Sequence, residues 1–342
     1  MKKLLLKMLG VTMASFIALT GCGSTADEAP SQQDEADEGA AQEEKTFKVG
    51  VTQFAEHPSL DAAYEGFKKA LEDAGLNVEY DFNNAAADQN NVATIAQNLV
   101  ANNVDLIFAN ATPSAQGAAQ ATKDIPIVFT SVTDPVSAGL VPSMEEAGEN
   151  ITGVVDLHPE AIENTISFID KYFEGATVGV IYNPGEANSV SQMDKVKAAA
   201  EGTSLKIETR SVSATSEVKQ AAESLVGVAD VFYIFTDNTV VEALESVISV
   251  ANDQQIPLVV GEPDSLKRGG FATYGIDYYT IGYRAGEMAA QILKGEKAVN
   301  EIAPEYPSEI QLFINKKAAE LQGVEWVAEW DEIAQFVEAE QE

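Results

Sequence analysis

The sequence predicts an α/β protein made of two units, each with a doubly wound parallel sheet. Three observations support this prediction. Strand-like apolar segments alternate with helical segments, and the alternation starts again near residue 159. The 342 residues suffice for two domains, and a hydrophobic content of 45% can fill their cores. Several strands end in hydroxyl or amide side chains, which is typical of a ligand site at the edge of a parallel sheet.

Residues 1–22 have the layout of a lipoprotein export signal. Lys2, Lys3 and Lys7 precede an apolar run from Met8 to Leu19, which is too short to span a membrane comfortably. The run leads into Leu-Thr-Gly-Cys ending at Cys22, which resembles a bacterial lipobox. In such signals the cysteine is diacylated and becomes the mature N-terminus. We therefore predict an extracytoplasmic protein, anchored by lipidated Cys22 to the outer face of the cell membrane.

Residues 23–45 are predicted to be a disordered acidic tether. From Ala26 to Glu44 the segment is rich in Asp, Glu, Gln, Ala and Ser and has no large apolar residue. Such a composition cannot bury surface and repels itself. Removal of the signal with its three lysines changes the formal net charge from −33 to −36. This charge argues against nucleic acid as a partner, because nucleic acids are bound by clustered Lys and Arg.

The first α/β unit is predicted between residues 46 and 156. Its helices are expected over Ser59–Ala74, over the run with apolar residues at helical spacing from Val92 to Val100, with Asp88 as its cap, and in a short segment near residue 116. Its strands are expected at Phe47–Gln53, Val78–Phe82, Asp105–Ala109 and Ile125–Phe129. Ile151–Asp156 is interpreted as a segment that crosses to the second unit.

The second unit repeats the alternation. Its strands are expected at Thr177–Tyr182, Leu205–Ser211, Val231–Phe235, Pro257–Val260, Phe271–Ile276 and Ile310–Ile314. Its helices are expected at Pro159–Phe173, Ser189–Ala200, Ser216–Val226, Thr239–Asn252 and Tyr278–Leu293, with a last amphipathic helix carrying Trp326, Trp330, Ile333 and Val337. Helical spacing makes core packing the expected role of both tryptophans.

Polar side chains follow the strands of both units and suggest a cleft between them. In the first unit they are Thr112, Ser114, Thr130, Ser131, Thr133 and Asp134, with Gln53 and Phe54 at the end of the first strand. In the second unit they are Asn183 to Glu186 and Thr236 to Thr239, and Asp277 follows a later strand. Each residue could instead be a helix cap, so the prediction rests on the repetition.

The sequence offers no enzyme, metal or cofactor motif. Cys22 is the single cysteine and lies in the export signal, so neither a disulfide framework nor a cysteine metal site is expected. His57 and His158 are the two histidines, and neither belongs to a recognisable triad; His57 is expected at the surface or the rim of the cleft. Phosphate-loop and dinucleotide fingerprints do not occur. We predict a protein that is not an enzyme and needs no cofactor.

Several separated motifs together resemble the ABC-transporter substrate-binding lipoproteins of the tryptophan/tyrosine-binding type. The resemblance spans residues 47–323. The motifs are Thr52-Gln53-Phe54, Glu56-His57-Pro58-Ser59-Leu60-Asp61, Ala111 to Gln116, Ile125 to Thr130, Val132-Thr133-Asp134-Pro135, Tyr182 to Ser189, Thr236 to Val240 and Gly275 to Tyr279.

This resemblance implies the type I periplasmic-binding-protein fold, in which two α/β lobes are joined by three crossings. The N-terminal lobe would comprise residues 46–154 and 277–296, and the C-terminal lobe residues 155–276 and 297–342. A monomer would bind an aromatic amino acid, with tryptophan the first candidate, and present it by lobe closure to an ABC permease and its ATPase.

The resemblance also suggests roles for the strand-end residues. Thr112, Ser114, Ser131 and Thr133 would hold a carboxylate, and Asp277 or Asp134 would pair with an ammonium group. Asn188, Thr236 and Asn238 would close from the second lobe, Phe54 and Tyr182 would stack on an aromatic side chain, and Gln53 belongs to the same set. The alternatives are another small solute (a different amino acid, a nucleoside or a sugar), a ligand sensor for a membrane signalling protein, and a secreted hydrolase.

Overall fold

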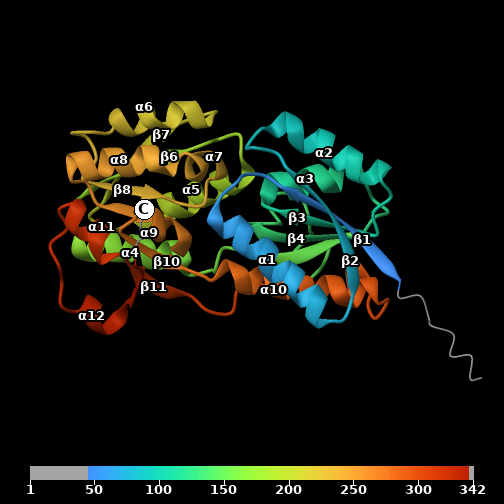
Figure 1. The fold of residues 1–342 in the computed structure, drawn as a ribbon. Helices are drawn as coiled ribbons and strands as arrows, with labels where there is room; N and C mark the ends of the chain where they lie inside the picture. Colours follow the sequence, from blue (N-terminus) through green and yellow to red (C-terminus); the bar gives the residue numbers. More distant parts are fainter. Residues whose placement is uncertain (1–44, 339–342) are drawn as a thin grey trace, which may run out of the picture. The chain divides into compact units, whose positions relative to one another are not determined.

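The computed structural model describes residues 45–338, so the predictions for the export signal and most of the tether lie outside the described residues. The chain forms two α/β lobes, each built on its own sheet (Figure 1). The strands of the first sheet are β1 (Thr46–Gln53), β2 (Asn77–Asn84), β3 (Leu106–Asn110), β4 (Ile127–Val132) and β5 (Ile151–Val155). They lie in the order β2-β1-β3-β4-β5 and are all parallel.

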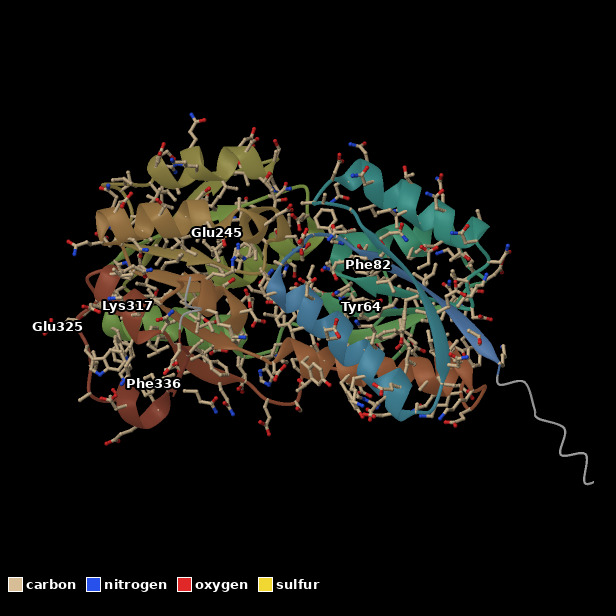
Figure 2. The ribbon with its side chains drawn as sticks, in the orientation of Figure 1. Tyr64, Phe82, Glu245, Lys317, Glu325 and Phe336 are labelled. Atoms are coloured by element: carbon tan, nitrogen blue, oxygen red, sulfur yellow. The ribbon has the colours of Figure 1, made fainter. Side chains whose placement is uncertain are left out.

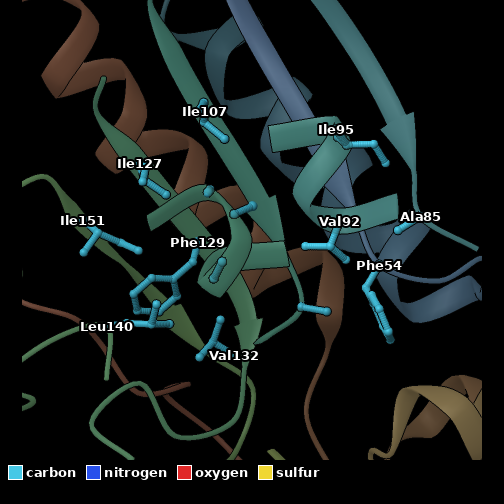
Figure 3. Packing of buried hydrophobic residues seen from close by; sticks show 14 of the residues in the cluster. Phe54, Ala85, Val92, Ile95, Ile107, Ile127, Phe129, Val132, Leu140 and Ile151 are labelled. Carbon is cyan, nitrogen blue, oxygen red and sulfur yellow. The ribbon is translucent and has the colours of Figure 1, made fainter. Parts of the chain in front are cut away.

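Helices cover both faces of the first sheet, as the doubly wound prediction requires (Figure 1). One face carries α2 (Gln89–Ala101) and α3 (Thr112–Ala121), and the other carries α1 (Pro58–Asp73) and α10 (Tyr278–Leu293). Ile107 and Phe129 point to the first face and pack below α2 and α3 (Figure 3), whereas Phe108 points to the second face and stacks on Phe67. At the edge of the sheet Tyr64 stacks on Phe82 of β2 (Figure 2).

The second sheet has the order β12-β11-β10-β9-β8-β6-β7. Its strands are β6 (Thr177–Tyr182), β7 (Lys206–Ser211), β8 (Val231–Ile234), β9 (Leu258–Val260), β10 (Ala272–Gly275), β11 (Gln311–Ile314) and β12 (Gln335–Phe336). Its helices are α4 (Ala161–Tyr172), α5 (Ala187–Ala200), α6 (Val218–Glu223), α7 (Asn238–Glu242), α8 (Leu244–Gln254), α9 (Pro263–Arg268), α11 (Lys316–Leu321) and α12 (Trp330–Ile333). β11 runs antiparallel to β10, and the other neighbours are parallel.

The chain passes between the two sheets three times: after β5, after β10, and between α10 and β11. α10 follows a strand of the second sheet yet packs on α1 and on the first sheet. The third passage is tied to the first, because Glu305 pairs with Val154 and its carboxylate accepts hydrogen bonds at 2.8 Å from Arg284. These passages are the three crossings that the resemblance implies, while the residue boundaries of the lobes remain a prediction.

α1 and α10 approach so closely that glycine is required between them. A Cβ atom on Gly282 would lie 1.9 Å from the carbonyl oxygen of Ala63, and one on Gly66 would lie 2.1 Å from the carbonyl oxygen of Tyr279. Real Cβ atoms do not approach backbone this closely, so any larger residue must push the helices apart.

We therefore expect Gly282→Ala to lower the free energy of unfolding by about 2–3 kcal/mol, because overpacking forces the backbone to shift. Urea denaturation measures this change. Glu287→Ala on an exposed site of the same helix is the control and should cost less than about 1 kcal/mol. Equal stability of Gly282→Ala and the unmodified protein would contradict the close helix contact.

Three parts of the sequence prediction are wrong. Ile151–Asp156 is not only a crossing, since residues 151–155 form β5 in the first sheet. Thr130 and Ser131 lie within β4 and not after it, because the strand continues to Val132 through an irregularity. The predicted helix Thr239–Asn252 is divided into α7 and α8 at Ala243, whose ψ of 23° breaks the regular helix.

The C-terminal segment is also not the long amphipathic helix that was predicted. α12 has four residues, and the chain then extends into β12, which pairs with β11. The packing role predicted for Trp330 is confirmed, because its ring is 1% exposed and lies between Phe168 and Phe271. The two short helices α9 and α11 were not predicted.

Candidate functional site

A pocket lies between the two lobes, next to the carboxyl ends of strands from both sheets. Its empty space, which includes the part open to solvent, is about 310 Å³. From the first lobe it is lined by His57, Leu60, Ser131, Thr133, Asp156 and Tyr278. From the second lobe it is lined by Asn188, Thr236, Asp237, Asn238, Val241 and Glu262. This lining contains three carboxyl groups and no Lys or Arg.

Asp156 is the carboxylate of the first lobe. It directly follows β5 and is held by two hydroxyl donors, Thr133 Oγ1 at 3.1 Å and Tyr278 Oη at 2.9 Å. Burial raises the pKa of Asp156, although both hydrogen bonds favour the charged form. A partly buried carboxylate of this kind is stabilised by a cation that enters the pocket.

Ser131 has a backbone conformation that is uncommon for its residue type. Its φ is 56°, and the pairing of β4 with β5 is irregular between Phe129 and Val132. Such irregularities redirect side chains at the ends of strands and cluster at functional sites. Here they accompany the placement of Ser131 in the wall of the pocket, where its Oγ atom is buried without a partner.

Unpaired polar atoms gather in and around the pocket. Ser131 Oγ, Asn188 Oδ1 and His57 Nδ1 are buried, lack hydrogen-bond partners and belong to lining residues. Three more are found at the neighbouring ends of β3 and β4, on Asn110, Thr112 and Thr130. Folded proteins rarely leave buried polar atoms unpaired. The three such atoms that line the pocket, on Ser131, Asn188 and His57, can be satisfied by a polar ligand.

The wall of the second lobe is organised by two buried acids, Glu186 and Asp237. Glu186 accepts hydrogen bonds from the Asn238 side chain at 2.6 Å and from Thr239 Oγ1 at 2.7 Å. Asp237 caps α7 and accepts from Ser189 Oγ at 2.6 Å. Burial and the nearby charge of Glu186 raise the pKa of Asp237. These bonds fix Asn238 and the start of α7 against the pocket.

Contacts between the lobes hold the structure in a closed form. Ser59 at the start of α1 donates a hydrogen bond of 2.6 Å to Glu262 of the second lobe. Asp134 of the first lobe accepts from Ser191 Oγ at 2.9 Å and lies 3.5 Å from Lys195 Nζ, both on α5. Burial and the charge of Asp264 raise the pKa of Glu262. The pocket is therefore enclosed by links at two separate places.

Five of the predicted site residues line the pocket: Ser131, Thr133, Asn188, Thr236 and Asn238. The other seven lie outside the lining. Gln53 bonds to Asp61 and Asn110, Phe54 belongs to the hydrophobic core (Figure 3), and Ser114 accepts a hydrogen bond from Thr52. Thr112 is buried at the start of α3, Tyr182 packs near Phe235, and Asp134 links the lobes. Asp277 is exposed and caps α10.

The sequence interpretation did not identify Asp156 and Glu262 as lining residues, and it placed His57 at the surface or the rim. His57 is in fact 8% exposed, and burial together with the charge of Arg268 lowers its pKa to about 3. The position of Asp156 directly after an apolar strand was a usable signal, which the interpretation of 151–156 as a crossing concealed. The burial of His57 depends on contact between the lobes and has no signal in the sequence.

Two α/β lobes with a polar pocket between them and three crossings define a solute-binding protein of the type I periplasmic-binding-protein fold. Residues 48–334 match the family described as ABC transporter substrate binding protein, and the chain belongs to this family. It is thus the extracytoplasmic substrate-binding component of an ABC transporter.

Comparison with characterised proteins supports this assignment. The chain is 40% identical over 323 residues to a tyrosine-binding protein of Clostridioides difficile, covering 92% of this chain and 90% of the relative. It resembles a Streptococcus pneumonia ABC domain solved in complex with L-Trp, with a TM-score of 0.81, 34% identity, and coverage of 86% of this chain and 100% of the other. Such relatives do not favour the alternative solutes or the sensor role.

A second similar structure bears on the conformation. It is the ligand-free, open form of a substrate-binding protein with adhesive properties from Clostridium difficile, 37% identical, covering 86% of this chain and 100% of that one. Its TM-score is 0.63, lower than that of the L-Trp complex at similar identity. The difference agrees with the contacts between the lobes, which close the pocket.

Proposed function

We propose that this substrate-binding protein binds an aromatic L-amino acid in the pocket between its lobes, with tryptophan and tyrosine as the two candidates. Asp156, in a lining without Lys or Arg, carries the proposal, because an amino acid brings the ammonium group that this carboxylate needs. The named ligands of the two relatives, tyrosine and L-Trp, support the aromatic class.

The ligand's carboxylate would be bound by neutral donors. Ser131 offers an unpaired hydroxyl group from the first lobe, and the Asn238 side-chain amide, which uses one of its two hydrogens on Glu186, offers the other from the second. Because these residues come from both lobes, a bound carboxylate would join them. Ligand binding then favours the closed form by the difference in affinity between the two conformations.

A thermal-shift screen tests the proposal. The purified protein is first unfolded and refolded to remove any bound ligand, then heated with each of the twenty amino acids and with sugars and nucleosides. A ligand at 100 times its Kd stabilises the native state by about 2.7 kcal/mol. We expect the largest shift with tryptophan or tyrosine. A shift with a sugar or nucleoside alone would contradict the proposal.

We also propose that Cys22 anchors the protein to the membrane through its lipid. The basic start, the apolar run and the lipobox support this proposal. No helix among residues 45–338 is long and apolar enough to cross a bilayer, a finding that says nothing about the anchor. Cells grown with labelled palmitate should label the unmodified protein, whereas Cys22→Ser should lose the label and leave the membrane fraction. Membrane retention of unlabelled Cys22→Ser would contradict the lipid anchor.

A further inference from the structure

We infer that His57 determines ligand specificity by forming a hydrogen bond with a polar group on the ligand's side chain. The inference rests on the proposed function and concerns the same pocket. His57 lines the pocket, is 8% exposed, and has a buried Nδ1 atom without a partner. A buried polar atom that is left unpaired lowers the stability of the complex. A ligand that satisfies His57 is therefore favoured over one that does not.

The position of His57 places it next to the apolar part of the pocket. It is the N-cap residue of α1, and Leu60 lies in the first turn of the same helix; both side chains line the pocket. Leu60 from the first lobe and Val241 from the second are the aliphatic residues of the lining. Since the remaining lining residues carry polar groups, an aromatic ring is expected to lie against these two side chains, within reach of His57.

The chemistry of the imidazole fits this role. The lowered pKa of His57 keeps the ring neutral at physiological pH. A neutral imidazole has one N–H donor and one nitrogen acceptor. It can accept a hydrogen bond from the indole N–H of tryptophan, or form one with the phenol O–H of tyrosine. Phenylalanine offers neither group and would leave His57 unpaired.

Discrimination against phenylalanine is the consequence. A site built to hydrogen-bond a substrate group rejects the analogue that lacks it more strongly than an apolar site rejects a change of size. We expect the unmodified protein to bind its preferred ligand, tryptophan or tyrosine, at least ~10-fold more tightly than phenylalanine. The loss of one buried hydrogen bond accounts for a factor of this size.

The test is a calorimetric comparison of L-tryptophan, L-tyrosine and L-phenylalanine on the full chain and on His57→Leu. The inference predicts that His57→Leu loses affinity for the preferred ligand and keeps or gains affinity for phenylalanine, so that the ratio falls below about threefold. His57→Gln retains a neutral hydrogen-bonding group and should keep part of the ratio. His158→Gln, a histidine outside the lining, should leave the ratio unchanged.

An unchanged ratio in His57→Leu, or an equal loss for all three ligands, would overturn the inference, because a structural role weakens every ligand alike. Lack of discrimination in the unmodified protein would overturn it too. These outcomes leave the proposed function intact. Absence of binding by any of the three amino acids to the unmodified protein would instead refute the proposed function. If His57→Leu does not fold, the test uses the ratio of the affinity for the preferred ligand to that for phenylalanine in His57→Gln. A ratio equal to that of the unmodified protein, or an equal loss of affinity for all three ligands, would contradict the inference.

Discussion

Asp156→Asn is expected to weaken the binding of the aromatic ligand by at least ~30-fold. The substitution keeps the size of the side chain and leaves Thr133 and Tyr278 within hydrogen-bonding distance of it. It removes the negative charge that faces the pocket. Removing one member of a buried charge pair costs about 2–5 kcal/mol, much of it from the charge left behind on the other member. Here that charge is the ligand's ammonium group. Titration calorimetry on folded protein measures the change.

The matched control is Asp277→Asn. The sequence made Asp277 a candidate for the ammonium partner, but its side chain is exposed, caps α10 and does not line the pocket. Asparagine also caps helices well, so this variant should bind within about threefold of the unmodified protein. A large loss in Asp277→Asn with little change in Asp156→Asn would reverse the assignment.

The same assignment predicts a pH dependence of binding. Only the ionised carboxylate attracts an ammonium group, and burial raises the pKa of Asp156. Affinity should be constant well above this raised pKa and should fall as the pH drops through it, starting at a higher pH than for an ordinary aspartate. The Asp156→Asn variant should lack this component.

Trp330→Ala is expected to cause the largest loss of stability, about 3–5 kcal/mol, because it leaves a cavity in the core of the second lobe. The ring of Trp330 lies 5.8 Å from Phe168, 5.5 Å from Phe271 and 5.1 Å from Tyr172, measured between ring centroids. Its removal takes away the contacts that hold the segment with α12 and β12 against these three rings. Chemical denaturation measures the change.

Trp326→Ala is the control for this prediction. Trp326 packs edge-on against Trp330 at 5.3 Å but is only partly buried, so its removal should cost clearly less. Because α12 and β12 lie at the end of the chain, the Trp330 variant should also lose protection of backbone amides there first. Equal stability losses for the two tryptophans would contradict the central place of Trp330.

The sequence predicted most of the fold because its local patterns agree with its tertiary structure. The helix Tyr278–Leu293 and the strand Thr177–Tyr182 have the predicted bounds, since strong periodicity and clear caps fix them. The C-terminal segment was mispredicted because Trp326 and Trp330 have helical spacing for another reason. Their rings pack on one core, while the backbone between them and Phe336 is set by pairing with β11.

Lining residues that follow the ends of strands could be predicted from the sequence. Residues that reach the pocket only because the two lobes close on each other could not. Ser131, Thr133, Thr236 and Asn238 follow from the rule that ligands lie at the carboxyl ends of parallel strands, whereas Asn188 was suggested by the family resemblance. Two other candidates have structural roles instead of lining the pocket. Asp277 caps α10, and Asp134 forms a contact between the lobes. The local sequence gives no sign that Ser59 meets Glu262 across 203 positions of the chain.

Closure connects this geometry to transport. The links Ser59–Glu262 and Asp134–Ser191 exist only when the lobes meet, and each is a modest hydrogen bond. A ligand that adds bonds to Asp156 on one side and Asn188 on the other would shift the balance further toward the closed form. The closed form is then the signal that the transporter can recognise.

The most direct test of the central proposal is titration calorimetry of L-tryptophan and L-tyrosine into the purified, ligand-stripped protein. We expect one ligand per chain, with an affinity that Asp156→Asn lowers by at least ~30-fold. Binding of neither amino acid, or undiminished binding by Asp156→Asn, would contradict the proposal that the pocket between the lobes holds an aromatic amino acid by its ammonium group.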